Sequence, residues 1–491
     1  MGVEMLSRRQ MLRLSVLAAG SAALAACGAT PAPTATTAPT QAPLQEEAAP
    51  TATAAVQEPA AEVTVAGEPS PAAKLSGKIE YYSYDLGPAN ESREGIKSAF
   101  EEAHPEAKVT LTFLPYGENW DKLAALMASG TPPDVIYGDF SLLKHALADQ
   151  LLDMNDQIAA DPVLSDASKF TVDMRDPVIA KLGTSHVYQL PLGTWVPLLY
   201  YNRELFDAAG QTHPDETWTW DDLREVAQKL TDPANARWGF QWGTIFDIVG
   251  ELWWLQQPKD FWAVPQAFPE TSDFNNEVGI TTFSQFHTYG EAGDKSSVPS
   301  AEMGGFSVYG AAFGAGKAAM TLAGDWDAGW GYRDLPFPWA VTYVPMLKEG
   351  YRANLNVMWA TSAIAKGTKN PQLAWEFARF ISASPEGQKF IGQGAYETPV
   401  LREVAESDAV LKPDWAQPGY DYRVKAAELP GPSYCVYPLN MNLWEFPSKF
   451  IDPTVEKLRL GEMKPEEAVA YLDQEGKPYF EKQKADMPPV S

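Results

Sequence analysis

The sequence predicts an α/β protein of more than one lobe, in which each lobe is a mostly parallel sheet wrapped by helices. Strand and helix patterns alternate from residue 78 to 139, and a second alternation runs from about 198 to 314. With 491 residues, 45% of them hydrophobic and 21% charged, the chain is long enough to bury a sizeable core.

The first alternation starts at a segment of β-forming residues and ends at a Pro-Pro breaker followed by a short apolar run. Its predicted elements are strands at 78–84, 108–113 and 134–138 and helices at 91–103 and 120–129. Ligands of parallel sheets bind beyond the carboxyl ends of the strands, where Tyr84 and Asp139 lie. Both are candidate ligand residues; the alternatives are a core edge for Tyr84 and a helix N-cap for Asp139.

The second alternation follows two extended segments that flank a Gly-Thr-Trp kink ending at Trp195. Thr219 and two acids predict the start of a helix, and residues 238–243 predict a strand. Further on, residues 356–365 predict an extended segment, and residues 370–381 predict an amphipathic helix with Pro371 at its first position.

The stretch from Gly316 to Trp326 runs through a short apolar strand and delivers Asp325 and Trp326 side by side after Gly324. A carboxylate takes hydroxyl hydrogen bonds and an indole covers a ring face, so this pair suits a polar, ring-shaped ligand. The alternative is a core tryptophan. The 16 tryptophans favour a surface that binds something flat.

Composition excludes several classes of function. The net charge of −26 speaks against nucleic-acid or anionic-membrane surfaces, which need clustered Lys and Arg. The five histidines show no metal-ligand spacing, and neither a metal nor a cofactor is expected. No stretch reaches the roughly 18–20 apolar residues of a membrane span.

The N-terminus predicts export and lipidation. Residues 1–26 contain a twin-arginine pattern at Arg8 and Arg9 and a short apolar run, and Leu24-Ala25-Ala26-Cys27 resembles a lipoprotein box. Cleavage before Cys27 would leave its thiol to carry the lipid; the alternative is a chance cysteine after a secretory signal. Residues 27–75 comprise this cysteine and a Pro/Ala/Thr-rich tether, which is expected to be disordered.

Six motifs in order resemble the carbohydrate-binding group of extracellular solute-binding proteins of bacterial ABC importers, which includes the maltose-binding protein. They are Gly130-Thr-Pro-Pro-Asp-Val-Ile, Leu199-Tyr-Tyr-Asn-Arg-Glu-Leu-Phe, Thr217-Trp-Thr-Trp-Asp-Asp-Leu, Gly316-Lys-Ala-Ala-Met to Gly324-Asp-Trp, Lys366-Gly-Thr-Lys-Asn-Pro with Ala374-Trp-Glu-Phe, and Gly461-Glu-Met-Lys-Pro-Glu-Glu-Ala. The resemblance covers essentially all of residues 78–485.

The resemblance implies a two-lobed periplasmic-binding-protein fold with hinge crossings, an interlobe cleft and a helical C-terminal part. The expected division is lobe one at 76–190 plus 325–360, lobe two at 198–316 plus 366–485, and crossings at 191–197, 318–324 and 360–366. The implied partners are a sugar ligand and the membrane permease of the importer, and the protein is expected to be an extracytoplasmic, lipid-anchored monomer.

The resemblance also points to residues that contact the ligand. In relatives an aromatic residue corresponding to Trp326 stacks on a sugar ring, and an acid at the position of Asp139 binds a hydroxyl. Many relatives carry a glycine pair where this chain has Val357-Met358-Trp359, so either Trp359 takes part in the cleft or the pocket is reshaped there. The full set of candidates is Tyr84, Trp120, Asp139, Trp195, Trp242, Asp325, Trp326, Trp359, Asn442 and Trp444.

Two alternative interpretations of the function remain. A surface glycoside hydrolase needs two facing carboxylates, and no such pair or nucleophile motif is marked out, so no catalytic residue and no enzymatic activity is expected. A non-sugar solute such as a polyol, a polyamine or a peptide is the other alternative, since polyamine binders also combine acids with aromatic residues.

Overall fold

The computed structural model describes residues 75–138, 142–172, 186–242, 274–303, 311–346, 357–427, 429 and 445–487. Cys27, Asp139, Asn442 and Trp444 lie outside the described residues, and for Trp359 only the backbone is described. None of the helices in the described part has both the length and the apolar character of a membrane-spanning helix.

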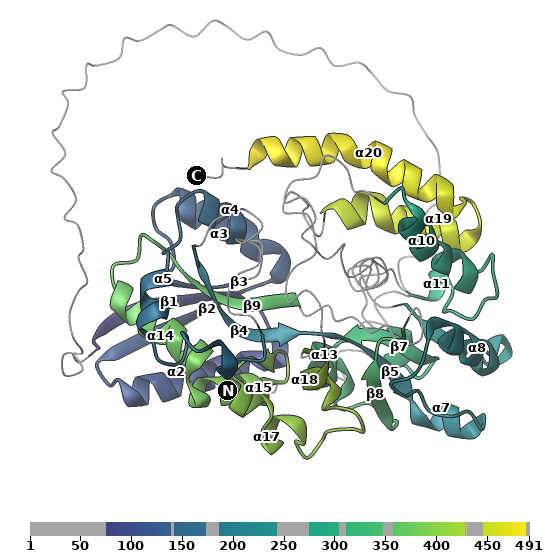
Figure 1. Cartoon of the computed structure of the whole chain (residues 1–491), viewed down its shortest axis with the longest axis horizontal. Coiled ribbons are helices and arrows are strands. Elements are labelled where there is room, and N and C mark those ends of the chain that lie inside the picture. Colours follow the sequence, from purple (N-terminus) through teal and green to yellow (C-terminus); the bar gives the residue numbers. More distant parts are fainter. Residues whose placement is uncertain are drawn as a thin grey trace, which may run out of the picture. The chain divides into compact units, whose positions relative to one another are not determined.

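A six-stranded sheet forms the first part of the fold, with strand order β10-β4-β9-β3-β1-β2 (Figure 1). Its central strands are almost entirely buried because helices pack on them: α14 contacts β1, β4 and β9, and α3 contacts β1. The strands are β1 (Gly77–Tyr84), β2 (Ala107–Leu114), β3 (Val135–Gly138), β4 (Gln189–Trp195), β9 (Val357–Ile364) and β10 (Thr398–Pro399).

Helices from both halves of the chain accompany this sheet. In α14 the apolar residues Leu373, Ala374, Phe377 and Ile381 recur at helical spacing and are buried, as the amphipathic pattern predicted. The helices before β4 are α2 (Asn90–Ala103), α3 (Tyr116–Ala128), α4 (Leu143–Leu147) and α5 (Asn155–Ala160); those after β9 are α14 (Pro371–Ala383), α15 (Pro385–Gly394), α16 (Arg402–Ala405), α17 (Asp408–Leu411) and α18 (Tyr422–Ala427).

A four-stranded sheet of order β6-β7-β5-β8 forms the second part. The predicted cap of α8 is confirmed, because Thr219 and Asp222 form a capping box at its start. The strands are β5 (Pro197–Asn202), β6 (Trp238–Gln241), β7 (Ala318–Gly324) and β8 (Trp339–Tyr343); the helices are α7 (Arg203–Ala208), α8 (Trp220–Leu230), α10 (Glu277–Tyr289), α11 (Ser300–Met303), α12 (Ala311–Gly314), α13 (Asp325–Asp327), α19 (Asp452–Leu460) and α20 (Pro465–Asp486).

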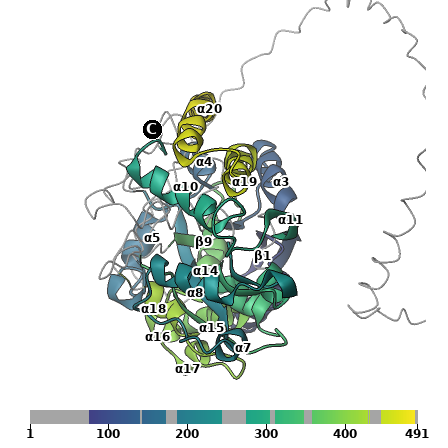
Figure 2. The same cartoon turned by 90° about the vertical axis from the view of Figure 1, so that its right-hand side faces the viewer.

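The C-terminal helices belong with the second part of the fold. Figure 2 shows α10, α19 and α20 beside one another, and the three helices contact each other. Their buried side chains, among them Phe286, Leu458 and Phe480, join the same hydrophobic core as β5 and β7.

The predicted α/β class with two sheets is confirmed, but the expectation of mostly parallel sheets is wrong. β1 pairs in parallel with β2 and β3, and β6 pairs in parallel with β7, whereas β4, β5, β8, β9 and β10 pair antiparallel with their neighbours. A buried apolar strand has the same residue pattern in either direction, so the sequence could not distinguish the two arrangements.

Strand pairing also corrects the predicted division of the chain. β8 lies in the four-stranded sheet beside β5, although residues 325–360 were expected in lobe one. Helices α14 and α15 pack on the six-stranded sheet, although residues 366–485 were expected in lobe two. Each segment follows the sheet that buries its apolar face.

Of the three predicted crossings, only 191–197 joins the two sheets. There β4 ends at Trp195 and β5 begins at Pro197, with Val196 between them. Strand β7 at 318–324 pairs only with β5 and β6, and strand β9 stays in the six-stranded sheet up to Ile364.

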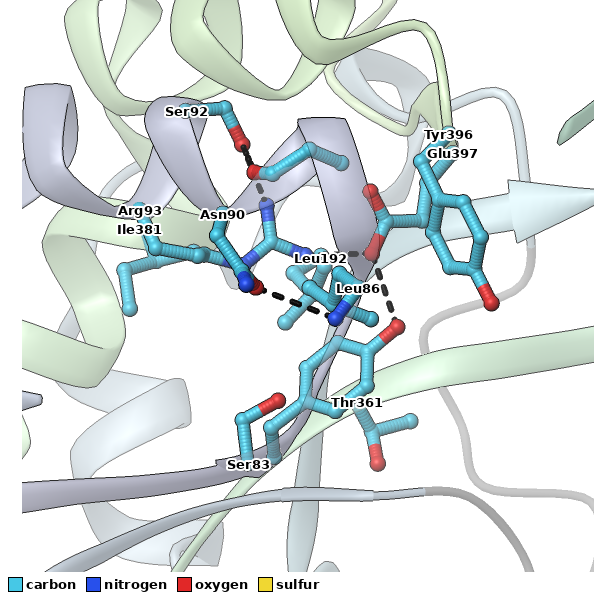
Figure 3. A network of polar contacts seen from close by, with 12 residues as sticks. Ser83, Leu86, Asn90, Ser92, Arg93, Leu192, Thr361, Ile381, Tyr396 and Glu397 are labelled. Atoms are coloured by element: carbon cyan, nitrogen blue, oxygen red, sulfur yellow. Dashed lines mark hydrogen bonds and ion pairs between the residues drawn. The ribbon is translucent and has the colours of Figure 1, made fainter. Parts of the chain in front are cut away.

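A buried polar network ties the start of α2 to the segment before β10 (Figure 3). Arg93 forms an ion pair with Glu397, whose Oε1 atom also accepts a hydrogen bond of 2.7 Å from the Tyr137 hydroxyl. Figure 3 shows the Glu397 carboxylate directed toward Arg93, while the ring of the preceding Tyr396 lies on the other side. Burial raises the pKa of the nearby Tyr81 to about 12, and Glu397 adds to that rise. Because Glu397 follows Tyr396 directly in the sequence, this network fixes the backbone position of Tyr396.

The substitution Glu397→Gln should lower the free energy of unfolding by about 3–5 kcal/mol, because the Arg93 guanidinium would stay buried without its counter-ion. Chemical denaturation measures this loss. The matched control is Asp408→Asn, which breaks the exposed pair with Lys412 and should leave stability unchanged. A loss below about 1 kcal/mol for Glu397→Gln would show that the pair does not hold this region.

Candidate functional site

The junction between the two sheets is closed by a reciprocal pair of hydrogen bonds between Val196 and Asp325. The Val196 amide donates to the Asp325 Oδ1 atom at 3.0 Å, and the Asp325 amide donates to the Val196 carbonyl at 2.9 Å. Pro197 and Gly324 form the last pair in the register of β5 and β7. The Asp325 side chain thus continues the pairing of β5 and β7 one step beyond the end of the strands. Its partner there is Val196, where the chain passes from the six-stranded to the four-stranded sheet.

The second carboxylate oxygen of Asp325 is also occupied by protein groups. The Thr398 hydroxyl donates to Oδ2, and the Arg423 Nη2 atom lies 3.3 Å from the same oxygen. Arg423 further donates to the Thr398 hydroxyl at 2.7 Å and to the Tyr420 hydroxyl, and its guanidinium lies 5.0 Å from the Tyr420 ring centroid. We call Val196, Asp325, Thr398 and Arg423 the junction network.

The junction network connects elements that are distant in the sequence. Thr398 belongs to β10 of the six-stranded sheet, whereas Arg423 belongs to α18, which contacts both β4 and β8. The Asp325 and Arg423 side chains are 0% and 1% exposed, so their attraction acts with little screening by water.

Burial dominates the electrostatics of this carboxylate. It raises the pKa of Asp325 to about 6, although Arg423, the Thr398 hydroxyl and the Val196 amide all favour the ionised form. Beneath the network the Tyr200 hydroxyl donates to the Gly324 carbonyl at 3.0 Å, and burial raises the pKa of Tyr200 well above its usual value.

Gly324 determines where the Trp326 ring lies. A Cβ atom at Gly324 would lie 2.1 Å from the indole Cζ3 atom, so the ring occupies the space that any other residue would need. Trp326 is partly exposed and packs against the core of the six-stranded sheet. The glycine therefore lets the indole fold back over the end of β7.

Four aromatic residues, Trp326, Trp195, Tyr396 and Trp330, form a continuous row. The ring centroids of Trp326 and Trp195 are 5.8 Å apart, those of Trp195 and Tyr396 are 5.6 Å apart, and those of Tyr396 and Trp330 are 6.5 Å apart. All three contacts are edge-to-face, and the Trp195 indole donates to the Tyr396 carbonyl at 3.0 Å. We call these four residues the aromatic row.

A second aromatic group lies at the carboxyl end of β1. The Tyr84 ring is 6.4 Å from that of Trp120 and 5.2 Å from that of Tyr137. Burial raises the pKa of Tyr396, and the neighbouring Tyr84 side chain opposes the rise. The second group therefore lies next to the aromatic row.

The structure thus brings together five of the predicted site residues: Trp195, Asp325 and Trp326 at the junction, with Tyr84 and Trp120 next to them. Asp325 differs from the expectation in one respect, because it is buried and both its oxygens bond to protein groups. The position of Asp325 after a strand was predicted, but the sequence did not predict that its side chain points into the protein.

Trp242 lies elsewhere, in the core of the four-stranded sheet. Its side chain is 0% exposed, stacks on Trp220 at 5.8 Å and contacts Phe286 at 4.8 Å. A ring enclosed in this way presents no face to a ligand in this arrangement. Trp218, Trp220, Trp238 and Trp339 are core residues as well, so a large share of the tryptophans does not belong to a binding surface.

Three residues of the site were not predicted from the sequence: Tyr396, Trp330 and Arg423. Tyr396 and Arg423 act through contacts across 201 and 98 positions of sequence, which no local pattern reports. Trp330 had a weak signal, since it follows Trp326 by four residues. No group of acids, histidines or cysteines suited to a metal ion occurs among the described residues.

The family is decided by a sequence profile. The profile described as bacterial extracellular solute-binding protein matches residues 80–389, which is more than half of the chain. This chain belongs to that family. Membership in a family of solute-binding proteins confirms the expectation of a binding protein rather than an enzyme.

Curated members of the family match at low identity. A maltotriose-binding protein of Pyrococcus abyssi is 25% identical over 338 residues, which is 66% of either chain. An arabinooligosaccharide-binding protein of Bacillus subtilis is 26% identical over 298 residues, which is 58% of this chain and 65% of that protein. The matches therefore span just under two thirds of the length of these relatives.

Solved structures share the fold of this solute-binding protein over most of its length. An ABC substrate-binding protein of Listeria monocytogenes in complex with cycloalternan aligns with a TM-score of 0.66 at 21% identity, covering 84% of this chain and 100% of that one. A sugar-binding protein of Xanthomonas citri also aligns with a TM-score of 0.66, at 16% identity, covering 83% and 98%. The likeness establishes the fold.

The raised pKa of Asp325 predicts how stability depends on pH. Because the folded-state pKa lies above the unfolded value, the protonated form contributes stability below about pH 4, and this contribution is lost as the pH rises through about 6. In Asp325→Asn this dependence is absent. The free energy of unfolding of the wild type, relative to the variant, should therefore fall by about 2 kcal/mol between pH 4 and pH 7.

Urea denaturation of both proteins across this range measures the difference. A difference that stays constant, or that grows with pH, would show that Asp325 is ionised throughout and that the ion pair with Arg423 outweighs burial.

Proposed function

We propose that this protein captures a carbohydrate on the aromatic row and delivers it to the membrane permease of an ABC importer. The observation that carries the proposal is the partly exposed Trp326 ring, which is held over Gly324 and flanked by Trp195. A ring that is fixed before binding loses little freedom when a ligand stacks on it.

The chemistry of a sugar matches this arrangement. The faces of a pyranose ring are apolar and stack on aromatic rings, while the hydroxyl groups at the edge need polar partners. Covering one face removes on the order of 50 Å² of apolar surface from water, or about 1.2 kcal/mol at ~25 cal/mol per Å². Useful affinity therefore requires hydrogen bonds to the hydroxyl groups in addition to stacking. The names of the relatives, which bind maltotriose and arabinooligosaccharides, support the sugar class.

Asp325 serves this site by positioning and not by direct contact. Its oxygens hold Val196, Thr398 and Arg423, and the residues next to Val196 and Asp325 in the sequence are Trp195 and Trp326. The carboxylate thus fixes the relative placement of the two indoles. Candidate roles for Asp139, Trp359, Asn442 and Trp444 in binding hydroxyl groups or ring faces stay part of the proposal.

The proposed setting is the outer face of the cell membrane. The signal at residues 1–26 and the lipoprotein box at Cys27 support a lipid anchor, and the tether that follows would hold the binding part of an extracytoplasmic monomer near its permease.

A thermal-shift screen tests the ligand class. Mono- and oligosaccharides should raise the melting temperature of the unliganded protein, because a ligand that binds only the folded state stabilises it. A shift with polyols, polyamines or peptides and none with any sugar would replace the carbohydrate proposal by one of the other solute classes.

Trp326→Ala should lower the affinity for the ligand found in this screen by roughly ten-fold, because one stacked face is lost. The unliganded variant should lose little stability, since the ring is already partly exposed. Calorimetric titration and denaturation measure the two effects. Trp339→Ala, at a fully buried position, is the control and should cost about 3–5 kcal/mol of stability. If Trp326→Ala behaves like this control and binds normally once folded, Trp326 is a core residue.

The mature protein should begin at a diacylated or triacylated Cys27. Mass spectrometry of the protein extracted from membranes, after proteolysis, identifies the N-terminal peptide and its modification. An unmodified Cys27, or an N-terminus at another residue, would remove the lipid anchor from the proposal.

A further inference from the structure

Trp330 is an exposed aromatic residue next to the proposed site. Its side chain is 49% exposed, and with Leu460 it is one of two large hydrophobic residues exposed in the described part of the chain. It lies in a π-helical turn, Ala328–Tyr332, which directly continues α13. Such turns are uncommon and frequently occur at functional sites.

Close backbone contacts hold Trp330 in place on two sides. Gly87 has a φ of +59°, and a Cβ atom there would lie 2.4 Å from the Trp330 Nε1 atom. The Gly87 amide donates to the Asp85 Oδ1 atom at 2.8 Å, so this loop is itself ordered. On the other side a Cβ atom at Gly329 would lie 2.6 Å from the carbonyl oxygen of Ala395. Both glycines permit an approach that a side chain would prevent.

Trp330 is continuous with the proposed stacking residue Trp326. The two lie four residues apart, Trp326 in α13 and Trp330 in the π-helical turn that follows it. The contacts of Tyr396 with Trp330 and Trp195, and of Trp195 with Trp326, connect them through the rest of the aromatic row. An exposed indole at the end of such a row provides a second ring face, connected to the first through Trp195 and Tyr396.

We infer that Trp330 is a second stacking platform, and that the ligand is therefore a saccharide of at least two rings whose further ring lies on Trp330. This inference rests on the proposed function and narrows it from sugars in general to oligosaccharides. Covering an exposed tryptophan face with a sugar ring removes apolar surface from water. A ligand long enough to reach Trp330 should therefore bind with higher affinity than a single ring.

The test is a calorimetric titration of Trp330→Ala with two series of probes: glucose, maltose and maltotriose, and arabinose, arabinobiose and arabinotriose. For the series that the wild type binds, Trp330→Ala should lower the affinity for the two- and three-ring probes by roughly eight-fold, because about 50 Å² of stacked surface is lost. The affinity for the single-ring probe should stay unchanged. Trp326→Ala should weaken the probes of every length.

Three further variants separate stacking from structure. Trp330→Phe keeps a ring face and should retain most of the affinity for the longer probes. Gly87→Ala should displace the indole and weaken the longer probes, but should have no further effect on their binding in the Trp330→Ala background. Leu460→Ala removes the other large hydrophobic side chain that is exposed in the described residues, and it should leave the binding of all probes unchanged.

Equal binding of every probe length by Trp330→Ala and the wild type would overturn the inference and leave the proposed function intact; Trp330 would then contact another protein or none. An equal loss for the single ring would also overturn it, because Trp330 would belong to the first subsite. If the wild type binds none of these probes in titration and no sugar in the thermal-shift screen, the carbohydrate function itself fails and the inference fails with it.

Discussion

The arrangement of the site depends on one buried carboxylate at the junction of the two sheets. Asp325 holds the Val196 amide, the Thr398 hydroxyl and the Arg423 guanidinium at once, and the three residues come from separate parts of the chain. Leaving any of these donors unpaired in a buried position would cost more than the bond contributes when it is made. The network therefore behaves as a unit, and the two tryptophans next to it in sequence, Trp195 and Trp326, take their places from it.

Much of the fold could be predicted because it follows from local patterns. The β-forming residues of β1, the capping box of α8 and the proline and apolar spacing of α14 each specify an element without help from distant residues. Strand direction and sheet membership could not be predicted in the same way. β8 and residues 360–364 of β9 are mostly buried, but which sheet buries them depends on partners more than 100 positions away, such as β4 and β5. This is why β8, α14 and α15 lie with the other sheet than the predicted division of residues 325–360 and 366–485 placed them.

The candidate site shows the same limit at the level of single residues. The adjacency of Asp325 and Trp326 after a strand was visible in the sequence, and the structure places Trp326 partly exposed beside Trp195. The sequence could not show that Asp325 turns inward, because its partners Thr398 and Arg423 are 73 and 98 positions away. Tyr396 was missed for the same reason, since only its place beside Glu397, which the pair with Arg93 anchors, brings it to the row.

The most direct measurement is a crystal structure of the protein with a bound saccharide from the binding screen. We predict a sugar ring stacked on Trp326, with the Asp325 oxygens still bonded to Val196, Thr398 and Arg423 as they are in the unliganded chain. A sugar bound away from the aromatic row, or one whose hydroxyl groups replace these partners on Asp325, would contradict this prediction.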